Sequence, residues 1–357
     1  MPSGTSIILQ RILTTTAEYR ASDLHLTVGN PPILRVDGKL VALEQEQVVT
    51  PDFMDTVVET ILTPEQRTEL EKNREIIVAY ALEDRIRFKV SMFHQRGFLA
   101  ASLRLISNEL KSLKDLGLPA SVQQFAQLTK GLVLITGPFG SGRTATVAAL
   151  VNEINRTRTA YVVTIEKPIE HLYVNNMSFI EQREVGRDTK STVQALETAS
   201  REDVDVVVVS EMEDPEVIRA VLTAAESSRL VISTMNTDSV LKTIEMIATN
   251  APSEYEVKVR TQLAGTLAGI VSQRLLPKIG GGRVLVAEVM VPTDGIRAVI
   301  RDGALYQLAN LLTTSRGEGT ISLDRSLAQL VKSGDILLDD ALMHATDRNN
   351  VRLLARP

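Results

Sequence analysis

The sequence predicts an α/β protein in two parts: a domain built on a mostly parallel sheet, preceded by a smaller α+β domain. After residue 119, short apolar runs alternate with helical patterns, which is typical of βαβ units. Before residue 106, extended runs are separated by tight polar turns, which favours antiparallel strands. A polar segment that contains Leu, Gly and Pro separates the antiparallel pattern from the βαβ pattern. We therefore predict a first domain over 1–106, a linker over 107–118 and a second domain over 119–357.

The composition is ordinary for a globular protein and excludes several classes of function. Of 357 residues, 44% are hydrophobic and 23% are charged, so the chain can bury a large core and is not disordered. The net charge of −5 argues against a nucleic-acid partner, which would require excess positive charge. Without cysteine the chain has no disulfide, Cys-bound zinc or thiol nucleophile, and its four histidines show no metal-ligand spacing.

No apolar run approaches the roughly 18 residues that a membrane span requires. The first 16 residues read as an amphipathic helix, because they lack the basic start and long apolar core of a signal peptide. We therefore expect a cytoplasmic protein, with a membrane-associated partner left open.

In the first domain, Asp37-Gly38 is a turn signal between two short apolar runs and predicts a hairpin of 33–36 with 39–43. Helices are expected at Phe53–Leu62 and Glu65–Lys72, the second with Pro64 at its start. Three antiparallel strands should follow, at Glu75–Ala81, Arg85–Met92 and Phe98–Ile106.

In the second domain, the buried-strand candidates are Leu132–Thr136, Tyr161–Ile165, Val206–Val209, Leu230–Thr234 and Val284–Val289. Helical patterns fall between them, at Arg143–Asn155, Thr192–Ser200, Glu216–Ser227 and Glu254–Val271. The tail from about Thr293 is expected to be helical.

The sharpest local signal is a phosphate-loop motif at Gly131–Thr144, in which a short apolar strand leads through a glycine-rich loop into a helix. Glycines let backbone N–H groups turn inward around an anion, and the helix N-terminus adds partial positive charge. The residues predicted to bind nucleotide are Gly137, Pro138, Gly140, Ser141, Gly142, Arg143, Thr144 and Ala145.

Within this motif, Thr144 supplies the hydroxyl expected to ligate Mg²⁺, and Arg143 occupies the lysine position. Arginine is bulkier, planar and forked, so the exchange is not conservative at a tight phosphate site. We expect phosphate binding to survive this exchange better than turnover.

Two carboxylates and a group of arginines complete the candidate site. Glu211 follows the run Val206–Val209 and is placed to order Mg²⁺ or a water, unless it is only a surface carboxylate. Glu166 ends another strand and could accept a proton from the attacking water, although Lys167 offers it an ordinary charge partner. Arg85, Arg87, Arg96 and Arg104 cluster on the β-rich segment, either as a solvated face or as arginine fingers directed at a γ-phosphate.

Taken together, the chain resembles the PilT-type twitching-motility ATPases of the type II/IV secretion superfamily over nearly its whole length. The matching stretches are Ala21–Leu26, Pro31–Gly38, Arg87–Gly97, Gly131–Thr144, Thr164–Glu170, Glu181–Thr189, Ala195–Asp203, Glu211–Glu216, Thr223–Glu226, Lys278–Val284 and Gly295–Asp302. The last matches the family's retraction motif, with Ala298 in place of its usual asparagine.

The resemblance implies a PAS-like N-terminal domain, a RecA-like ATPase domain and a homohexameric ring, or a mixed ring with an active paralogue. ATP and Mg²⁺ would bind between the domains, and the motor would depolymerise type IV pili from the inner face of the cytoplasmic membrane, docked on the inner-membrane platform. By matching position, Glu166 would be the general base and Glu211 part of the Walker B segment. Arg87, Arg96 and Arg104 would be the interface arginines.

Departures from the family pattern concentrate at this site. Arg143 replaces a lysine, Lys167 replaces an aspartate, and Arg229 and Asn236 replace two histidines, while Ser210–Asp214 reads Ser-Glu-Met-Glu-Asp. Neither Arg229 nor Asn236 can shuttle a proton near neutral pH, although Asn236 can donate a hydrogen bond and Arg229 can contact a phosphate.

Two functions therefore remain open: a pilus-retraction motor with weakened ATP hydrolysis, and a nucleotide-binding but catalytically impaired paralogue that acts as a regulatory or structural subunit. A related secretion or pilus-assembly ATPase is a third reading, which the missing cysteine zinc site disfavours.

Overall fold

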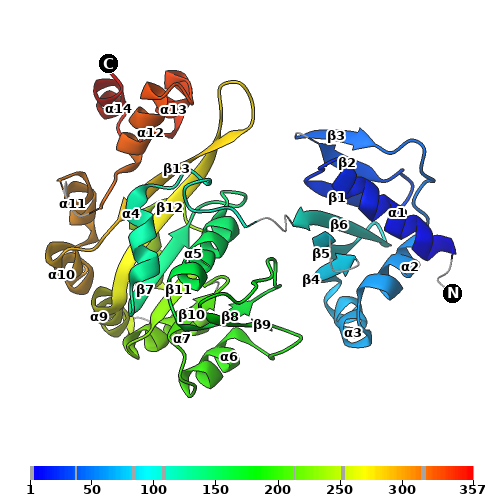
Figure 1. Ribbon diagram of the computed structural model, residues 1–357, viewed down its shortest axis with the longest axis horizontal. Helices are drawn as coiled ribbons and strands as arrows, with labels where there is room; N and C mark the ends of the chain where they lie inside the picture. The colour runs from blue at the N-terminus through cyan, green and yellow to red at the C-terminus, as the bar shows by residue number, and fades with distance from the viewer. Residues whose placement is uncertain are drawn as a thin grey trace. The chain divides into compact units, whose positions relative to one another are not determined.

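The structure is a computed structural model that describes residues 4–36, 38–82, 86–106, 110–212, 214–250, 254–314 and 319–356. The chain forms two compact units (Figure 1). The first unit contains the chain up to residue 109 together with Lys167–Leu172, and the second unit contains Leu110–Glu166 and Tyr173–Pro357. The domain limits proposed from the sequence remain predictions.

The first unit is built on a six-stranded antiparallel sheet with the strand order β3-β2-β1-β6-β5-β4. Its strands are β1 (Asp23–Thr27), β2 (Ile33–Val36), β3 (Lys39–Ala42), β4 (Glu75–Leu82), β5 (Ile86–Gln95) and β6 (Phe98–Ile106). The predicted hairpin and the three predicted antiparallel strands are confirmed. Strand β1, at the centre of the sheet, was not predicted.

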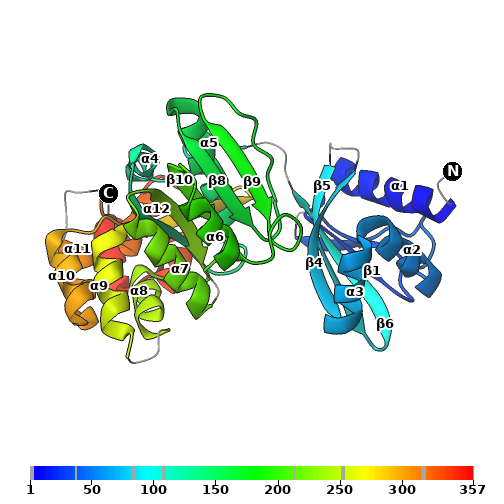
Figure 2. The same cartoon turned by 90° about the horizontal axis from the view of Figure 1, so that it is seen from below.

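Three helices pack on one face of this sheet (Figure 2): α1 (Gly4–Glu18), α2 (Pro51–Ile61) and α3 (Pro64–Asn73). Their apolar sides share a core with buried strand residues such as Phe88 and Leu103. The helix starts are set locally, because the hydroxyls of Thr50 and Thr63 accept hydrogen bonds from backbone N–H groups of the first turns of α2 and α3.

The segment Lys167–Leu172 belongs to the first unit although it lies between two strands of the second. Within this unit, Nη2 of Arg87 donates to the carbonyl oxygen of Ile169 at 3.3 Å, and Nζ of Lys89 pairs with Oε1 of Glu170 at 3.0 Å. The residues directly after Glu166 are therefore held by strand β5.

The second unit is built on a seven-stranded sheet with the strand order β13-β12-β7-β11-β10-β8-β9. The strands are β7 (Gly131–Thr136), β8 (Tyr161–Glu166), β9 (Phe179–Glu184), β10 (Val206–Val209), β11 (Leu230–Met235), β12 (Leu267–Pro277) and β13 (Arg283–Met290). Neighbouring strands run parallel except β13, which is antiparallel to β12. The prediction of a mostly parallel sheet is confirmed.

Helices cover both faces of this sheet (Figures 1 and 2). Helix α5 (Arg143–Thr157), with α4 (Ala120–Gln123) and the short 3₁₀ turn Gln124–Gln127, shares one hydrophobic core with the strands. The opposite core is formed with α6 (Thr192–Ser200), α7 (Pro215–Glu226), α8 (Val240–Thr249) and α9 (Glu256–Thr266). Strands β7, β8, β10 and β11 are thus buried from both sides, as their continuous apolar sequences predict.

One secondary-structure prediction in this unit was wrong. The sequence was expected to be helical over Glu254–Val271, but α9 ends at Thr266 and the chain continues directly as β12. The apolar periodicity of this segment is compatible with a helix or a strand. It forms a strand because β12 lies between β7 and β13 and pairs with both. Strand β9 and helix α8 were not predicted at all.

The tail is helical, as predicted, with α10 (Asp294–Asp302), a 3₁₀ turn (Leu305–Gln307), α11 (Leu308–Thr314), α12 (Leu323–Lys332), α13 (Leu338–His344) and α14 (Arg348–Leu354). Helices α12 to α14 form a small separate core with the ends of β12 and β13. No helix in the described part of the chain has the length and apolar character needed to cross a membrane.

Candidate nucleotide-binding site

The phosphate loop lies between the buried strand β7 and helix α5, as the motif predicts. Gly137, Gly140 and Gly142 all have positive φ angles, of 152°, 79° and 90°. A Cβ atom on Gly137 would collide with the carbonyl oxygen of Gln273 and with Oγ of Ser141. Glycine is therefore required at 137 both by the backbone conformation and by the space available.

Gln273, a fully buried residue of β12, supports the phosphate loop. Its Nε2 donates to the carbonyl oxygen of Ser141 at 2.8 Å, and its Oε1 accepts from Oγ1 of Thr146 at 2.9 Å. One side chain thus ties the loop to the first turn of α5. Gln273 was not predicted as a site residue, because it lies more than 120 positions from the loop in the sequence.

The loop fits a bound phosphate group. The Oγ of Ser141 is buried and has no hydrogen-bond partner among the described residues. A buried hydroxyl without a partner is costly, and a phosphate oxygen would satisfy it. The exposed residues Pro138, Phe139 and Gly140 leave the outer side of the loop accessible.

Arg143, the first residue of α5, forms an ion pair with Glu211. Its Nη1 lies 2.7 Å from Oε1 of Glu211, and the two side chains are 11% and 29% exposed. Glu211 follows β10, whose last residue Val209 is in register with Ser233 of β11, so its position at the carboxyl edge of the sheet is as predicted. The guanidinium thus already occupies an oxygen of the carboxylate expected to order Mg²⁺.

Glu166 ends β8 at the same edge, because Ile165 is in register with Val209 of β10. Its Oε1 accepts two hydrogen bonds, from Oγ1 of Thr164 at 2.7 Å and from Nε2 of Gln182 at 2.9 Å. Gln182 lies on β9, the strand that the sequence did not reveal. The structure therefore brings the phosphate loop, Glu211 and Glu166 to one edge of the second unit.

Thr144, the predicted hydroxyl ligand of Mg²⁺, is exposed on the first turn of α5, and Ala145 follows it in the same turn. The described residues contain no group of three or more His, Asp or Glu side chains that could hold a metal ion without further ligands. Mg²⁺ typically binds through one or two protein oxygens plus substrate phosphates. Thr144 and Glu211 fit that donor set only when a nucleotide supplies the remaining oxygens.

The candidate arginines lie on the first unit, and the structure separates them into two groups. Arg87 on β5 and Arg104 on β6 share one sheet face, because Lys89 is in register with Arg104 and lies two residues from Arg87. Nε of Arg104 pairs with Oδ1 of Asp23 at 3.0 Å, whereas Nε of Arg87 is buried and finds no partner within the described chain. Arg85 lies outside the described residues.

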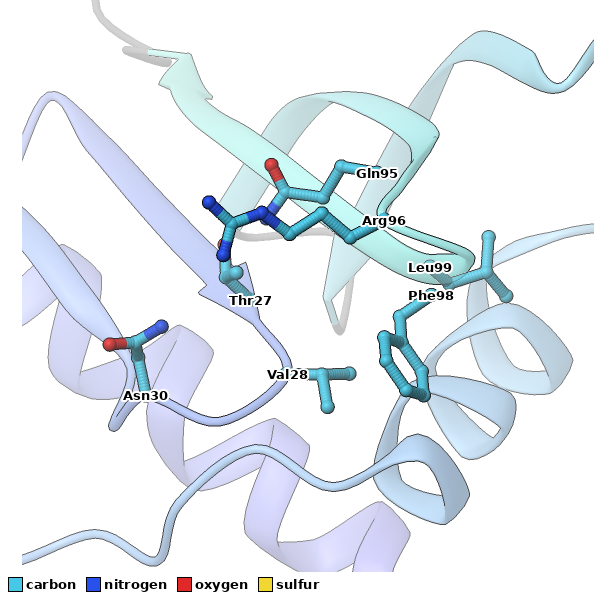
Figure 3. Close-up of a pocket in the computed structure, with 7 residues that line it drawn as sticks. All are labelled: Thr27, Val28, Asn30, Gln95, Arg96, Phe98 and Leu99. Atoms are coloured by element: carbon cyan, nitrogen blue, oxygen red, sulfur yellow. The ribbon is translucent and has the colours of Figure 1, made fainter.

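Arg96 occupies the turn between β5 and β6, with a positive φ of 50°. It lines a cavity of about 300 Å³ together with Thr27, Val28, Asn30, Gln95, Phe98 and Leu99, and Figure 3 shows its side chain extended beside Thr27 and Gln95. Arg96 is nine residues from Arg87 along an extended hairpin, roughly 30 Å at about 3.3 Å per residue. The three arginines of one chain cannot meet at one phosphate.

The structure overturns one expectation. Arg229 was expected to contact a phosphate, but it precedes β11 and therefore lies at the amino edge of the sheet, opposite the loop. Its Nη1 and Nη2 donate to the carbonyl oxygens of Ala199 and Ser200, at 2.8 and 3.3 Å, at the end of α6. Arg229 is thus a helix C-terminal cap. Asn236 follows β11 at the opposite, carboxyl edge and is exposed there.

These features define the class of protein. A buried strand, a loop that requires glycine, a helix directly after it and acidic residues at the ends of neighbouring parallel strands together make a P-loop ATPase.

The chain belongs to the type II/IV secretion system protein family, whose family model matches residues 4–341. It is 37% identical to the type IV pilus retraction ATPase PilT of Pseudomonas aeruginosa over 93% of this chain and 96% of that one. It is 34% identical to a twitching motility protein of Neisseria gonorrhoeae, over 98% of this chain and 94% of that one. A crystal structure of the pilus retraction motor PilT with bound ADP matches with a TM-score of 0.86 at 38% identity, over 97% and 99% of the two chains.

The fold class, the PilT-type family and the ATPase class predicted from the sequence are thereby confirmed. The comparisons favour the motor over the catalytically impaired subunit that the sequence left open as an alternative. The roles of the individual site residues are not tested by these likenesses and remain proposals.

Proposed function

We propose that the protein is an ATP-driven ring motor, a hexamer, that retracts type IV pili and produces twitching motility. The observation that carries this proposal is the phosphate loop, which has glycine at the position that requires it, Gly137, and a buried Ser141 hydroxyl without a partner among the described residues. The carboxylates of Glu211 and Glu166 lie at the same edge of the sheet as this loop. The likeness to pilus retraction ATPases over nearly the whole chain supports pilus retraction as the work that ATP hydrolysis drives.

In the proposed mechanism, the nucleotide phosphates lie in the cradle of residues 137–145. Backbone N–H groups of Gly140, Gly142 and the first turn of α5 donate to phosphate oxygens. Pro138 has no N–H of its own, and its carbonyl oxygen accepts from the N–H of Ser141 at 3.1 Å, which shapes the loop. Thr144 and Glu211 would hold Mg²⁺, which supplies neutralisation of the charge on the β- and γ-phosphates.

Glu166 acts as the general base. It accepts a proton from the water that attacks the γ-phosphorus, as the bond from that phosphorus to the bridging oxygen breaks and ADP leaves. Two donors on its Oε1 hold the carboxylate in one orientation. Loss of the γ-phosphate would release the interface arginines that a neighbouring subunit supplies and permit the rotation that does mechanical work.

The Arg143–Glu211 ion pair is expected to slow the ATPase cycle, because it must rearrange when nucleotide and Mg²⁺ bind. Glu211 must leave Nη1 of Arg143, 2.7 Å away, before it can serve Mg²⁺, and the guanidinium must turn to the phosphates. Arginine cannot enter a narrow site as lysine does. We therefore expect ATP binding to be retained and turnover to be slow.

The ring would work at the inner face of the cytoplasmic membrane, docked on the inner-membrane platform of the pilus machine. Native mass spectrometry of the ring isolated from cells would count its subunits. The same spectrum would show whether the ring contains an active paralogue beside this chain.

Steady-state phosphate release with Mg-ATP tests the proposed chemistry. We expect turnover below about 1 s⁻¹ that EDTA abolishes and that Glu166→Gln lowers at least ~100-fold, because it removes the base. Release no faster than that of Glu166→Gln would overturn the ATPase mechanism. In a piliated bacterium without its own retraction ATPase, the wild-type chain should restore twitching and Glu166→Gln should not.

A further inference from the structure

We propose that Gln182 is a positioning residue for the general base, holding the Glu166 carboxylate in the orientation that activates water. This inference rests on the proposed function, because it assigns the part that a second residue has in the same step. It comes from β9, whose residues the sequence analysis did not connect with catalysis.

The amide of Gln182 contacts different partners through its nitrogen and its oxygen. Its Nε2 donates to Oε1 of Glu166 at 2.9 Å, and its Oε1 accepts from the backbone N–H of Tyr173 at 3.1 Å. Because the N–H of Tyr173 can only donate, the amide oxygen must face Tyr173 and the amide nitrogen must face Glu166. The orientation of the donor is therefore fixed by the backbone and not by Glu166 itself.

The register of β9 places Gln182 on the correct face. Thr164 of β8 is in register with Gln182, so the two donors to Glu166 come from one side of the sheet. A shift by one residue would move Gln182 to the other face.

Contacts on that other face resist such a shift. Oη of Tyr161 donates to Oε2 of Glu181 at 2.8 Å, and Nη2 of Arg183 lies 2.8 Å from Oε2 of Glu202, beyond the end of α6. The residues on either side of Gln182 thus anchor the edge strand, and Gln182 between them is held against Glu166.

The donors from Thr164 and Gln182 end on the same oxygen of Glu166, Oε1. The last torsion of a carboxylate has a broad, shallow profile, so hydrogen bonds such as these orient its plane. A general base must lie within hydrogen-bond reach of the proton that it takes, and small misplacements lower the rate strongly. Gln182 should accordingly matter for the chemical step and little for nucleotide affinity.

The test compares Gln182→Glu and Gln182→Leu with wild type in steady-state ATP hydrolysis at pH 8. Gln182→Glu keeps the length of the side chain and an oxygen to accept from Tyr173, but replaces the donor by a charge that repels Glu166. A merely structural role in holding residue 173 would survive this change.

Gln123→Ala is the matched control, because Nε2 of Gln123 donates to Oε1 of Glu153 at 3.2 Å on an exposed surface away from the phosphate loop. We expect both Gln182 variants to lose about ten-fold or more in kcat, the effect of one lost hydrogen bond to a charged group. Their KM should stay within about three-fold and Gln123→Ala should match wild type. Thermal unfolding of each variant identifies any that fails to fold, and the comparison of kcat with KM then uses the variant that folds.

Three results would overturn the inference: Gln182→Glu within two-fold of wild type in kcat, a loss confined to KM, or an equal loss in Gln123→Ala. The proposed function fails separately, if the wild-type chain releases no phosphate, or if Glu166→Gln is as active as wild type.

Discussion

At the scale of single residues, Gly137 is the position where the site depends most directly on the identity of one residue. Gly137→Ala would drive a Cβ into the backbone oxygen of Gln273, and its φ of 152° disfavours any side chain. We expect about 2–4 kcal/mol less stability and loss of nucleotide binding. Thermal unfolding and titration with a fluorescent ATP analogue measure the two effects.

Gly140→Ala is the matched control for that prediction. Gly140 also has a positive φ, of 79°, but nothing lies within 4 Å of the Cβ that alanine would add. It should cost only the backbone strain, about 1 kcal/mol. Equal effects of the two variants would show that the collision with Gln273 is absent.

Arg143→Lys is the second prediction at this scale. We expect turnover to rise less than about ten-fold, because Lys167 still follows the base and Asn236 still replaces a histidine. Arg229 is not among the reasons, because it caps α6 at the opposite edge of the sheet. Phosphate-release kinetics of the single variant and of Arg143→Lys with Lys167→Asp provide the measurement. A rise of ~100-fold or more in the single variant would show that Arg143 alone limits turnover.

The residues predicted from the sequence were those in the local motif. Strand, loop and helix are consecutive in the chain, so the loop residues, Thr144 and the strand-end carboxylates could be placed without knowledge of the fold. Gln273 and Gln182 could not, because each acts on a partner on another strand through a tertiary contact. No spacing rule for one sequence contains that information.

At the scale of elements, the edge strand β9 depends on Tyr161 of β8. Burial, followed by the hydrogen bond to Glu181, raises the pKa of Tyr161 to about 12 from its usual 10.0. A pKa raised on folding means that this stabilisation is complete below pH 10 and is lost as the pH rises from 10 towards 12.

Tyr161→Phe should therefore be less stable than wild type at pH 8, by about 1 kcal/mol for the lost hydrogen bond. The difference should shrink above pH 10, since only the wild type loses stability by ionising Tyr161. Urea unfolding at pH 8, 10 and 11 measures it, and the common titration of lysines cancels in the comparison. A difference independent of pH would mean that the Tyr161 hydroxyl is not buried against Glu181.

The element predictions failed where tertiary pairing decides the structure. Strand β12 is apolar enough to continue α9, and only its place between β7 and β13 makes it a strand. Strand β9 has a half-exposed, polar sequence and lies at the sheet edge, so it lacks the apolar signal of the central strands. The location of Arg229, in contrast, could have been predicted, since it precedes a predicted strand and so lies at the amino edge.

At the scale of the whole molecule, the separation of the arginines constrains how a ring would be built. Arg87 and Arg96 lie roughly 30 Å apart at the two ends of one hairpin in the first unit. If both contact γ-phosphates, they serve two different sites. In a closed ring each subunit has two neighbours, so one chain can contribute to two sites.

Mixing two inactive variants tests this division. If Arg96 completes the site of a neighbouring subunit, rings assembled from equal amounts of Arg96→Ala and Glu166→Gln contain some fully wild-type sites, because the intact Glu166 of one variant meets the intact Arg96 of the other. Random assembly makes about a quarter of the sites complete, so the mixture should recover about a quarter of wild-type phosphate release. The same mixing experiment with Arg87→Ala in place of Arg96→Ala tests whether Arg87 completes the site of a neighbouring subunit. A mixture that stays as inactive as its components would place Arg96 and Glu166 in the site of the same chain. Phosphate release by Arg96→Ala alone at the wild-type rate would instead show that Arg96 takes no part in catalysis.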